Sequence, residues 1–163
     1  MVTPTGLDRR SDSLRAPPGT DREVPGVYRF VAARPWSQAL FDGLTRRGSV
    51  RYFLRRTWGS RDVDEALVDY CVLTARQPGA RFAPLAFLSG RLFSKDIRDV
   101  YERLEVPVWV PHGTRGDFRD FSGAGWTAAR PNWRVQPFES GALPQFEHPD
   151  AFESAYRAFL DAH

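Results

Sequence analysis

Two short apolar runs near the C-terminal end constrain the fold of this chain more than any other feature. The first covers residues 107–111 and is bounded by prolines, and the second covers residues 132–138. A helix-compatible stretch lies between them at about 121–130, and an amphipathic helix opens at Pro149. Strands joined through a helical crossover pair in parallel. Because parallel strands are buried on both faces and need neighbours, two strands cannot form a stable sheet alone, and the rest of the sheet must come from elsewhere.

The residues before these strands predict loops and helices. Residues 1–26 are expected to be irregular because proline and glycine interrupt them densely. From residue 27 to about residue 105, apolar residues recur at helical spacing. Within this block, Asp62 followed by Glu65 resembles a capping box at a helix start, and a further helix is expected from Pro84 to Phe93.

Composition excludes several classes of protein. Hydrophobic residues make up 42% of the chain, which is typical of globular domains rather than of disordered segments. No apolar run approaches the ~20 residues of a membrane-spanning helix, and the N-terminus has no apolar h-region of a signal peptide. Cys71 is the single cysteine, which excludes an internal disulfide and a cysteine-based metal cluster. These features predict a soluble cytoplasmic protein with no membrane association.

The net charge of +3 does not indicate nucleic-acid binding. The chain has 23 lysine and arginine residues against 20 acidic ones, and all of the 23 except Lys95 are arginines. The arginines are dispersed among the acidic residues and often stand directly beside them, as in Arg61-Asp62. A nucleic-acid interface would gather them on one face without acids. We therefore expect no nucleic-acid partner.

Two stretches near the C-terminus resemble loops of the α/β-hydrolases. Residues 107–118 read PVWVPHGTRGDF, which is similar to a family strand of the type P-V-x-x-x-H-G and the loop that carries the acid of the catalytic triad. Residues 140–149 read SGALPQFEHP, which is similar to the loop after the last strand, where the family has its catalytic histidine. Residues 2–6 resemble the strand end that precedes the lid. The resemblance covers the whole chain but only the second half of a family member.

This resemblance implies an α/β fold that comprises the C-terminal part of an α/β-hydrolase, with a mostly helical lid followed by a β-α-β-α unit of parallel strands. Residues 1–26 would be an irregular N-terminal segment, residues 27–93 the lid, and residues 94–163 the C-terminal portion of the core. The resemblance implies no metal and no organic cofactor. Four aromatic residues would line an apolar substrate pocket or, alternatively, pack within the lid itself: Trp36, Trp58, Phe82 and Phe87.

The chain departs from the family pattern at two catalytic positions. The nucleophile elbow G-x-S-x-G precedes the lid in such proteins, and no G-x-S-x-G occurs in this sequence, so we expect the nucleophile to lie outside the chain. When residues 143–147 are laid over the family's L-P-x-x-E, Ala142 occupies the position of the histidine. A methyl group can neither accept nor donate a proton, so general-base activation fails at that position. The sequence therefore leaves open whether the chain is an enzyme.

Three polar residues are candidates for the site. Asp117 is the candidate triad acid, one residue later than the common H-G-x-x-D spacing, and Asp120 is a second choice for the same role. As an acid Asp117 would orient a base; alternatively, it holds its own loop through backbone hydrogen bonds. His148 is a weak candidate base because it stands six residues beyond the base position. His112 directly follows the first strand and is typical of a packed structural histidine.

The sequence thus predicts the C-terminal half of a hydrolase of ester or related bonds in small apolar substrates, inactive on its own. Two alternatives stay open, namely a non-catalytic α/β-hydrolase-like binding or scaffold protein and a truncated gene product. The expected partners are a small apolar molecule in the complete protein, and an N-terminal half or a second chain that completes the sheet.

Overall fold

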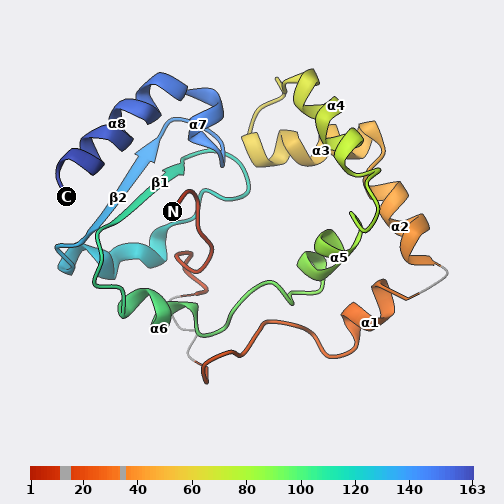
Figure 1. The fold of residues 1–163 in the computed structure, drawn as a ribbon, viewed down its shortest axis with the longest axis horizontal. Helices are drawn as coiled ribbons and strands as arrows, with labels where there is room; N and C mark the ends of the chain where they lie inside the picture. Colours follow the sequence, from red (N-terminus) through yellow and green to blue (C-terminus); the bar gives the residue numbers. More distant parts are fainter. Residues whose placement is uncertain (12–15, 34–35) are drawn as a thin grey trace. The chain divides into compact units, whose positions relative to one another are not determined.

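A computed structural model describes residues 1–11, 16–33 and 36–163 (Figure 1). These residues fold into two units. Unit 1 comprises residues 1–11, 56–61 and 97–163. Unit 2 comprises residues 16–33, 36–55 and 62–96. Residues 56–61 lie within the helical part of the sequence and yet belong to the unit that contains the strands.

Unit 1 is built on two parallel strands, β1 (Val108–Gly113) and β2 (Trp133–Phe138). The register pairs the first residue of each strand with the first of the other and the last with the last, so both strands end side by side. The segment that joins them contains η1 (Ser122–Ala129), a 3-10 helix. The predicted strand–helix–strand unit is confirmed. Its crossover takes the tighter helical form, in a segment with two glycines, which are poor α-helix formers.

The first three residues lie along the free edge of β1, outside the two-stranded sheet, and make two backbone hydrogen bonds to it. The N-terminal ammonium group of Met1 donates to the carbonyl oxygen of Trp109 at 2.7 Å, and the amide of Thr3 donates to that of Pro111 at 3.0 Å. Both partners advance by two residues in the same direction, which is the pattern of a parallel neighbour. The amide of Val108 donates to the carbonyl of Asn132, which directly precedes β2, so Val108 and Val110 direct their backbone groups towards β2. Trp109 and Pro111 direct theirs to the opposite edge of β1, and residues 1–3 lie there.

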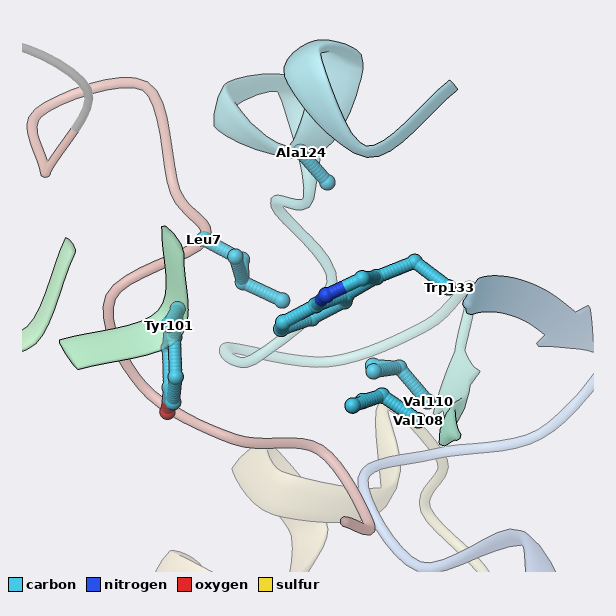
Figure 2. Close-up of a cluster of buried hydrophobic side chains, with 6 residues drawn as sticks. All are labelled: Leu7, Tyr101, Val108, Val110, Ala124 and Trp133. Atoms are coloured by element: carbon cyan, nitrogen blue, oxygen red, sulfur yellow. The ribbon is translucent and has the colours of Figure 1, made fainter. Parts of the chain in front are cut away.

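Alternate residues of β1 face opposite sides of the sheet, and both sides are covered. On one side, six buried side chains from the N-terminal segment, α6 (Ile97–Glu102), both strands and η1 form the core of unit 1 (Figure 2): Leu7, Tyr101, Val108, Val110, Ala124 and Trp133. Figure 2 shows the indole of Trp133 between Leu7 and the two valines. The hydroxyl of Tyr101 donates to the carbonyl oxygen of Thr5 at 2.9 Å, which ties α6 to the N-terminal segment.

The other side of β1 is covered by α8 (Pro149–Asp161), which follows the short helix α7 (Pro144–Glu147) and lies beside the strands in Figure 1. The ring of Trp109 lies 5.1 Å from that of Phe152, 5.8 Å from that of Tyr156 and 6.1 Å from that of Phe159. The final amphipathic helix is therefore confirmed, and its apolar face packs on one tryptophan.

Unit 2 consists of short helices: α1 (Val27–Val31), α2 (Trp36–Leu44), most of α3 (Arg47–Trp58), α4 (Glu65–Thr74) and α5 (Phe82–Leu88). Their buried apolar residues include Phe41, Val68 and Leu85, one from each of three helices. Residues 20–22 run antiparallel to residues 93–95, with the Arg22 amide bonded to the Phe93 carbonyl at 2.7 Å and the Lys95 amide bonded to the Thr20 carbonyl at 2.8 Å.

Two helix ends differ from the sequence-based expectation. The N-cap of α4 is Asp64 rather than Asp62, because the Asp64 carboxylate accepts the amide of Ala66 at 2.8 Å. The helix expected over residues 84–93 ends at Leu88 instead. Gly90 has a φ of +83°, and a Cβ there would lie 2.5 Å from the carbonyl oxygen of Arg22, so the chain leaves the helical conformation at a close approach of two backbones.

Candidate functional site

The candidate site lies where the two parallel strands end, the edge of an α/β sheet at which ligand sites form. Two loops leave this edge. Loop A (residues 114–118) follows β1, and loop B (residues 139–148) follows β2. The amides of Thr114 and Arg115 both donate to the carbonyl oxygen of Ser140, each at 3.0 Å. The loops are therefore joined through their backbones as soon as the strands end.

Residues 56–61 pack against both loops without intervening side chains. A Cβ at Gly141 would lie 2.5 Å from the Cα of Trp58. A Cβ at Gly116, whose φ is +78°, would lie 2.7 Å from the carbonyl oxygen of Arg56. Both positions therefore require glycine, because any larger residue would have to displace backbone.

Asp117 in loop A is held by Arg56. The Arg56 Nε lies 2.6 Å from one carboxylate oxygen of Asp117 and its Nη2 lies 2.9 Å from the other, while the Asp117 amide donates to the Arg56 carbonyl at 3.0 Å. The guanidinium keeps the pKa of Asp117 below its ordinary value, first through these hydrogen bonds and then through its charge. Asp117 is consequently ionised and fixed in orientation, with 44% of its side chain exposed.

Asp120 forms hydrogen bonds with Ser122 at the start of η1 and with the amide of Arg9. One of its oxygens accepts the amide of Ser122 at 3.0 Å and the hydroxyl of the same residue at 2.6 Å. These hydrogen bonds lower the pKa of Asp120. The second choice for an acid is therefore engaged in local turn geometry.

Ala142 lies buried between the N-terminal segment and residues 56–61, with 5% of its surface exposed. Its amide donates to the carbonyl oxygen of Thr57 at 3.2 Å, and its carbonyl accepts the hydroxyl of Thr3. Both of its backbone polar groups are thus satisfied inside unit 1. The position offers a buried methyl group and no group that can transfer a proton.

Glu147 and Arg115 fix the shape of loop B. One carboxylate oxygen of Glu147 accepts the amide of Gly141 at 2.6 Å, and the other pairs with the guanidinium of Arg115 in loop A. The Glu147 side chain is 19% exposed, so this ion pair is shielded more than a surface pair is. Glu147 therefore sets the backbone conformation one residue before Ala142 and ties loop B to loop A.

His148 and His112 lie at the ends of secondary-structure elements next to the two loops. His148 is the N-cap residue of α8, is exposed, and has its Nε2 3.3 Å from the carbonyl oxygen of Glu139. His112, at the end of β1, is buried and stacks on Phe121 with ring centroids 4.0 Å apart. His112 is thus packed, as expected. A catalytic role for His148 stays a prediction.

The four aromatic residues predicted for an apolar pocket are divided between the units. Trp58 belongs to unit 1, where it is buried. Its ring makes an edge-on contact with the ring of Phe146 in loop B, with the ring centroids 6.4 Å apart. The other three belong to unit 2, and 45% to 47% of the surface of each is exposed: Trp36, Phe82 and Phe87. Trp58 thus contacts the candidate site directly, whereas the three exposed rings present apolar surface on unit 2.

Within the described part of the chain, no group of three or more histidine, cysteine, aspartate or glutamate side chains could hold a metal ion. None of the helices there has the length and apolar character needed to cross a membrane. Burial raises the pKa of the Cys71 thiol, which disfavours the reactive thiolate.

Sequence reasoning assigned no role to Arg56, Thr57, Arg115 or Glu147, which shape the candidate site. Glu147 had a signal, since it stands at the glutamate of the L-P-x-x-E pattern. The others had none, because a guanidinium or a backbone carbonyl acquires its role from a partner distant in sequence.

Comparison with known proteins supports the fold at the level of structure. No protein-family model and no curated protein sequence matches this chain. The solved structure of the esterase EaEST from Exiguobacterium antarcticum matches 76% of this chain and 47% of its own, with a TM-score of 0.56 and 16% identity. Cfl2 from Burkholderia cenocepacia matches 91% of this chain and 53% of its own, with a TM-score of 0.59 and 22% identity.

A third structure, of a protein assigned as an aryl esterase from Burkholderia cenocepacia, matches 93% of this chain and 52% of its own, with a TM-score of 0.54 and 21% identity. The chain spans about half the length of these proteins. Its helical region, followed by two parallel strands with their helices, corresponds to the C-terminal half of the esterase structures. The predicted fold class is confirmed.

Proposed function

Because this chain has the fold of the C-terminal half of an α/β-hydrolase, we propose that it is the lid and C-terminal core of a cytoplasmic protein whose complete form handles small apolar esters or related compounds. In this proposal the chain is catalytically inactive alone. Ala142 supports the second part of the proposal: it is buried with both backbone groups bonded, and the sequence resemblance assigns its position to the family's base.

The roles of the remaining residues follow from this arrangement. Asp117 is the acid, held ionised by Arg56, and its carboxylate would stabilise an imidazolium if a base stood beside it. Trp58 would be an apolar contact for substrate at the candidate site, and the exposed aromatic residues of unit 2 would offer apolar surface of their own. Serine activation needs a nucleophile and a base, and this sequence contains neither a G-x-S-x-G elbow nor a histidine at position 142.

Ester turnover by the purified chain tests this proposal. We expect no hydrolysis of short-chain nitrophenyl esters above the buffer rate, for the chain and equally for Ala142→His, because restoring a base does not supply a nucleophile. Turnover that Asp117→Asn or His148→Ala abolishes would overturn the proposal, since either loss would show that the chain holds a working site.

A non-catalytic binding protein is the second candidate function. It is favoured by the close packing of loop B, which is held by Glu147 and Thr57 with alanine at position 142. The genomic sequence upstream separates the candidates. An in-frame G-x-S-x-G elbow there supports a truncated enzyme, and an upstream half with the elbow serine replaced supports the binding protein.

We further propose that additional β-structure completes the sheet along the outer edge of residues 1–3, supplied by an N-terminal half or by a second chain. The support is that β1 pairs with a strand on the β2 side alone among the described residues, while its other edge carries only the hydrogen bonds from Met1 and Thr3. Light scattering should detect association of the chain that rises with concentration. A monodisperse monomer over the whole concentration range would contradict this proposal.

A further inference from the structure

A hollow of about 700 Å³ lies in unit 2 at the C-terminal ends of α2 and α4. Its lining comes from residues 42–47 and 69–76, so it lies entirely within one unit. A neighbouring hollow of about 370 Å³ shares Asp42, Ala75 and Arg76 with it. These volumes are in the range of small-molecule sites, roughly 300–1,000 Å³.

Two guanidiniums in this hollow carry unbalanced charge. Within the described part of the chain, Arg46 and Arg76 form no hydrogen bond or ion pair through their side chains. Arg47, the third arginine of the lining, differs because it pairs with Glu65 at 2.6 Å and also with Asp69. Arg46 and Arg76 therefore retain donors for a ligand.

The helix ends do not account for these two guanidiniums. Basic residues at a helix C-terminus interact favourably with its last carbonyl groups. Here one carbonyl at each helix end already accepts a backbone amide: Thr45 donates to Phe41 at 2.9 Å, and Arg76 donates through its own amide to Leu73 at 3.1 Å. The helix dipoles favour guanidiniums at this position without occupying their N–H groups.

Asp42 sets the charge that a ligand should carry. Its carboxylate accepts the side-chain amide of Gln38 at 2.8 Å and lines the hollow together with Arg46 and Arg76. Two guanidiniums and one carboxylate leave one unit of positive charge. A monoanion balances this charge, whereas a dianion would place a second negative charge beside Asp42.

The remaining wall of the hollow is apolar. Val72, Leu73 and Ala75 line it, and Leu73 has 58% of its surface exposed. Leu73 can bury its exposed surface against an apolar ligand body, while Arg46 and Arg76 can bind an anionic head group. Guanidinium groups bind carboxylates through paired N–H donors, which favours a carboxylate as the head group.

We propose that this hollow binds an amphipathic monocarboxylate, with the carboxylate between Arg46 and Arg76 and the apolar body against Val72 and Leu73. The proposal depends on unit 2 alone and not on the function proposed for the strand-end site. Nothing in it requires catalysis by this chain.

Titration of the full chain with sodium octanoate, followed by amide chemical shifts in NMR spectra, tests the site. We expect saturable shifts at residues 42–47 and 72–76, with an affinity that falls as salt is added. Acetate lacks the apolar body and 1-octanol lacks the charge. Each should therefore bind at least about ten-fold more weakly than octanoate. Octanol binding as tightly as octanoate, or shifts confined to other residues, would overturn the proposal.

Substitution of the arginines gives an independent test. In Arg46→Gln with Arg76→Gln, octanoate should bind about ten-fold more weakly, since each exposed charge pair contributes roughly three-fold. Arg29→Gln is the matched control, because Arg29 is an exposed arginine of α1 outside the hollow, and its affinity should not change. Unchanged affinity in the double variant overturns the proposal. If that variant does not fold, the test of the proposal is the set of residues whose amide shifts change in the unmodified chain, together with the salt dependence of octanoate binding.

Discussion

Replacing Gly113 with alanine would separate the two loops that form the candidate site. A Cβ at Gly113 would lie 2.5 Å from the carbonyl oxygen of Ser140 and equally close to the carbonyl carbon of Gly141, where real contacts essentially never fall below 3.0 Å. The obstacles are backbone atoms, which cannot rotate away as a side chain does. Loop B must therefore move away from the end of β1.

The size of the effect follows from the hydrogen bonds that depend on loop B. Three are strained or lost when it moves: the amides of Thr114 and Arg115 to the carbonyl of Ser140, and the amide of Ala142 to the carbonyl of Thr57. At about 1 kcal/mol each, the expected loss in the free energy of unfolding is about 3 kcal/mol. That is a large part of a total that is typically about 5–15 kcal/mol.

Urea unfolding followed by tryptophan fluorescence, at low protein concentration, measures this loss. The signal reports mainly on unit 1, which contains four of the five tryptophans: Trp58, Trp109, Trp126 and Trp133. Gly125→Ala in η1 is the control, because its Cβ would meet nothing within 4 Å, and its stability should change by less than about 0.5 kcal/mol. If the two variants unfold with equal free energies, the described contact between β1 and loop B is wrong.

Two other predictions concern the ion pairs of the site. Glu147→Gln should lower the free energy of unfolding by about 1–2 kcal/mol, because it weakens a shielded ion pair and the hydrogen bond to the Gly141 amide. Glu153→Gln, in an exposed ion pair, is the control and should change the free energy of unfolding by less than about 0.5 kcal/mol in the same urea assay. The pKa of Asp117 is depressed in the folded state, so its contribution to stability is present above its unfolded pKa of about 3.9 and is lost as the pH falls through the lower folded value. An NMR titration should find the pKa of Asp117 below its ordinary value, and in Arg56→Gln this pKa should rise towards the ordinary value. A pKa of Asp117 that stays the same in Arg56→Gln would contradict the described ion pair.

Much of unit 1 could be predicted from local patterns. The strands after Pro107 and Asn132 are short apolar runs between turn residues, and α8 begins at a proline and repeats its apolar residues at helical spacing. Helix ends were less predictable. Asp62 and Asp64 are equally suitable caps in sequence, and the choice between them depends on where the backbone of α4 turns.

The candidate site could be predicted only in part. The patterns around Asp117 and Ala142 located both loops, because each follows a recognisable strand. Arg56 could not be found in this way, because it is separated from Asp117 by 61 residues and is one of many arginines. Its pairing depends on residues 56–61 returning to unit 1, which no local pattern specifies.

By itself the sequence determined the strand–helix–strand order, the absence of a histidine at position 142 and the absence of a G-x-S-x-G elbow, since these depend only on residue type and spacing. The tertiary structure decided that residues 56–61 contact both loop A and loop B and that Glu147 holds the backbone before Ala142. It also decided that Arg46 and Arg76 have no side-chain partner among the described residues, in a hollow of unit 2. The physical reason is that hydrogen bonds and ion pairs form between groups that are close in space, and folding brings together groups that are far apart in sequence.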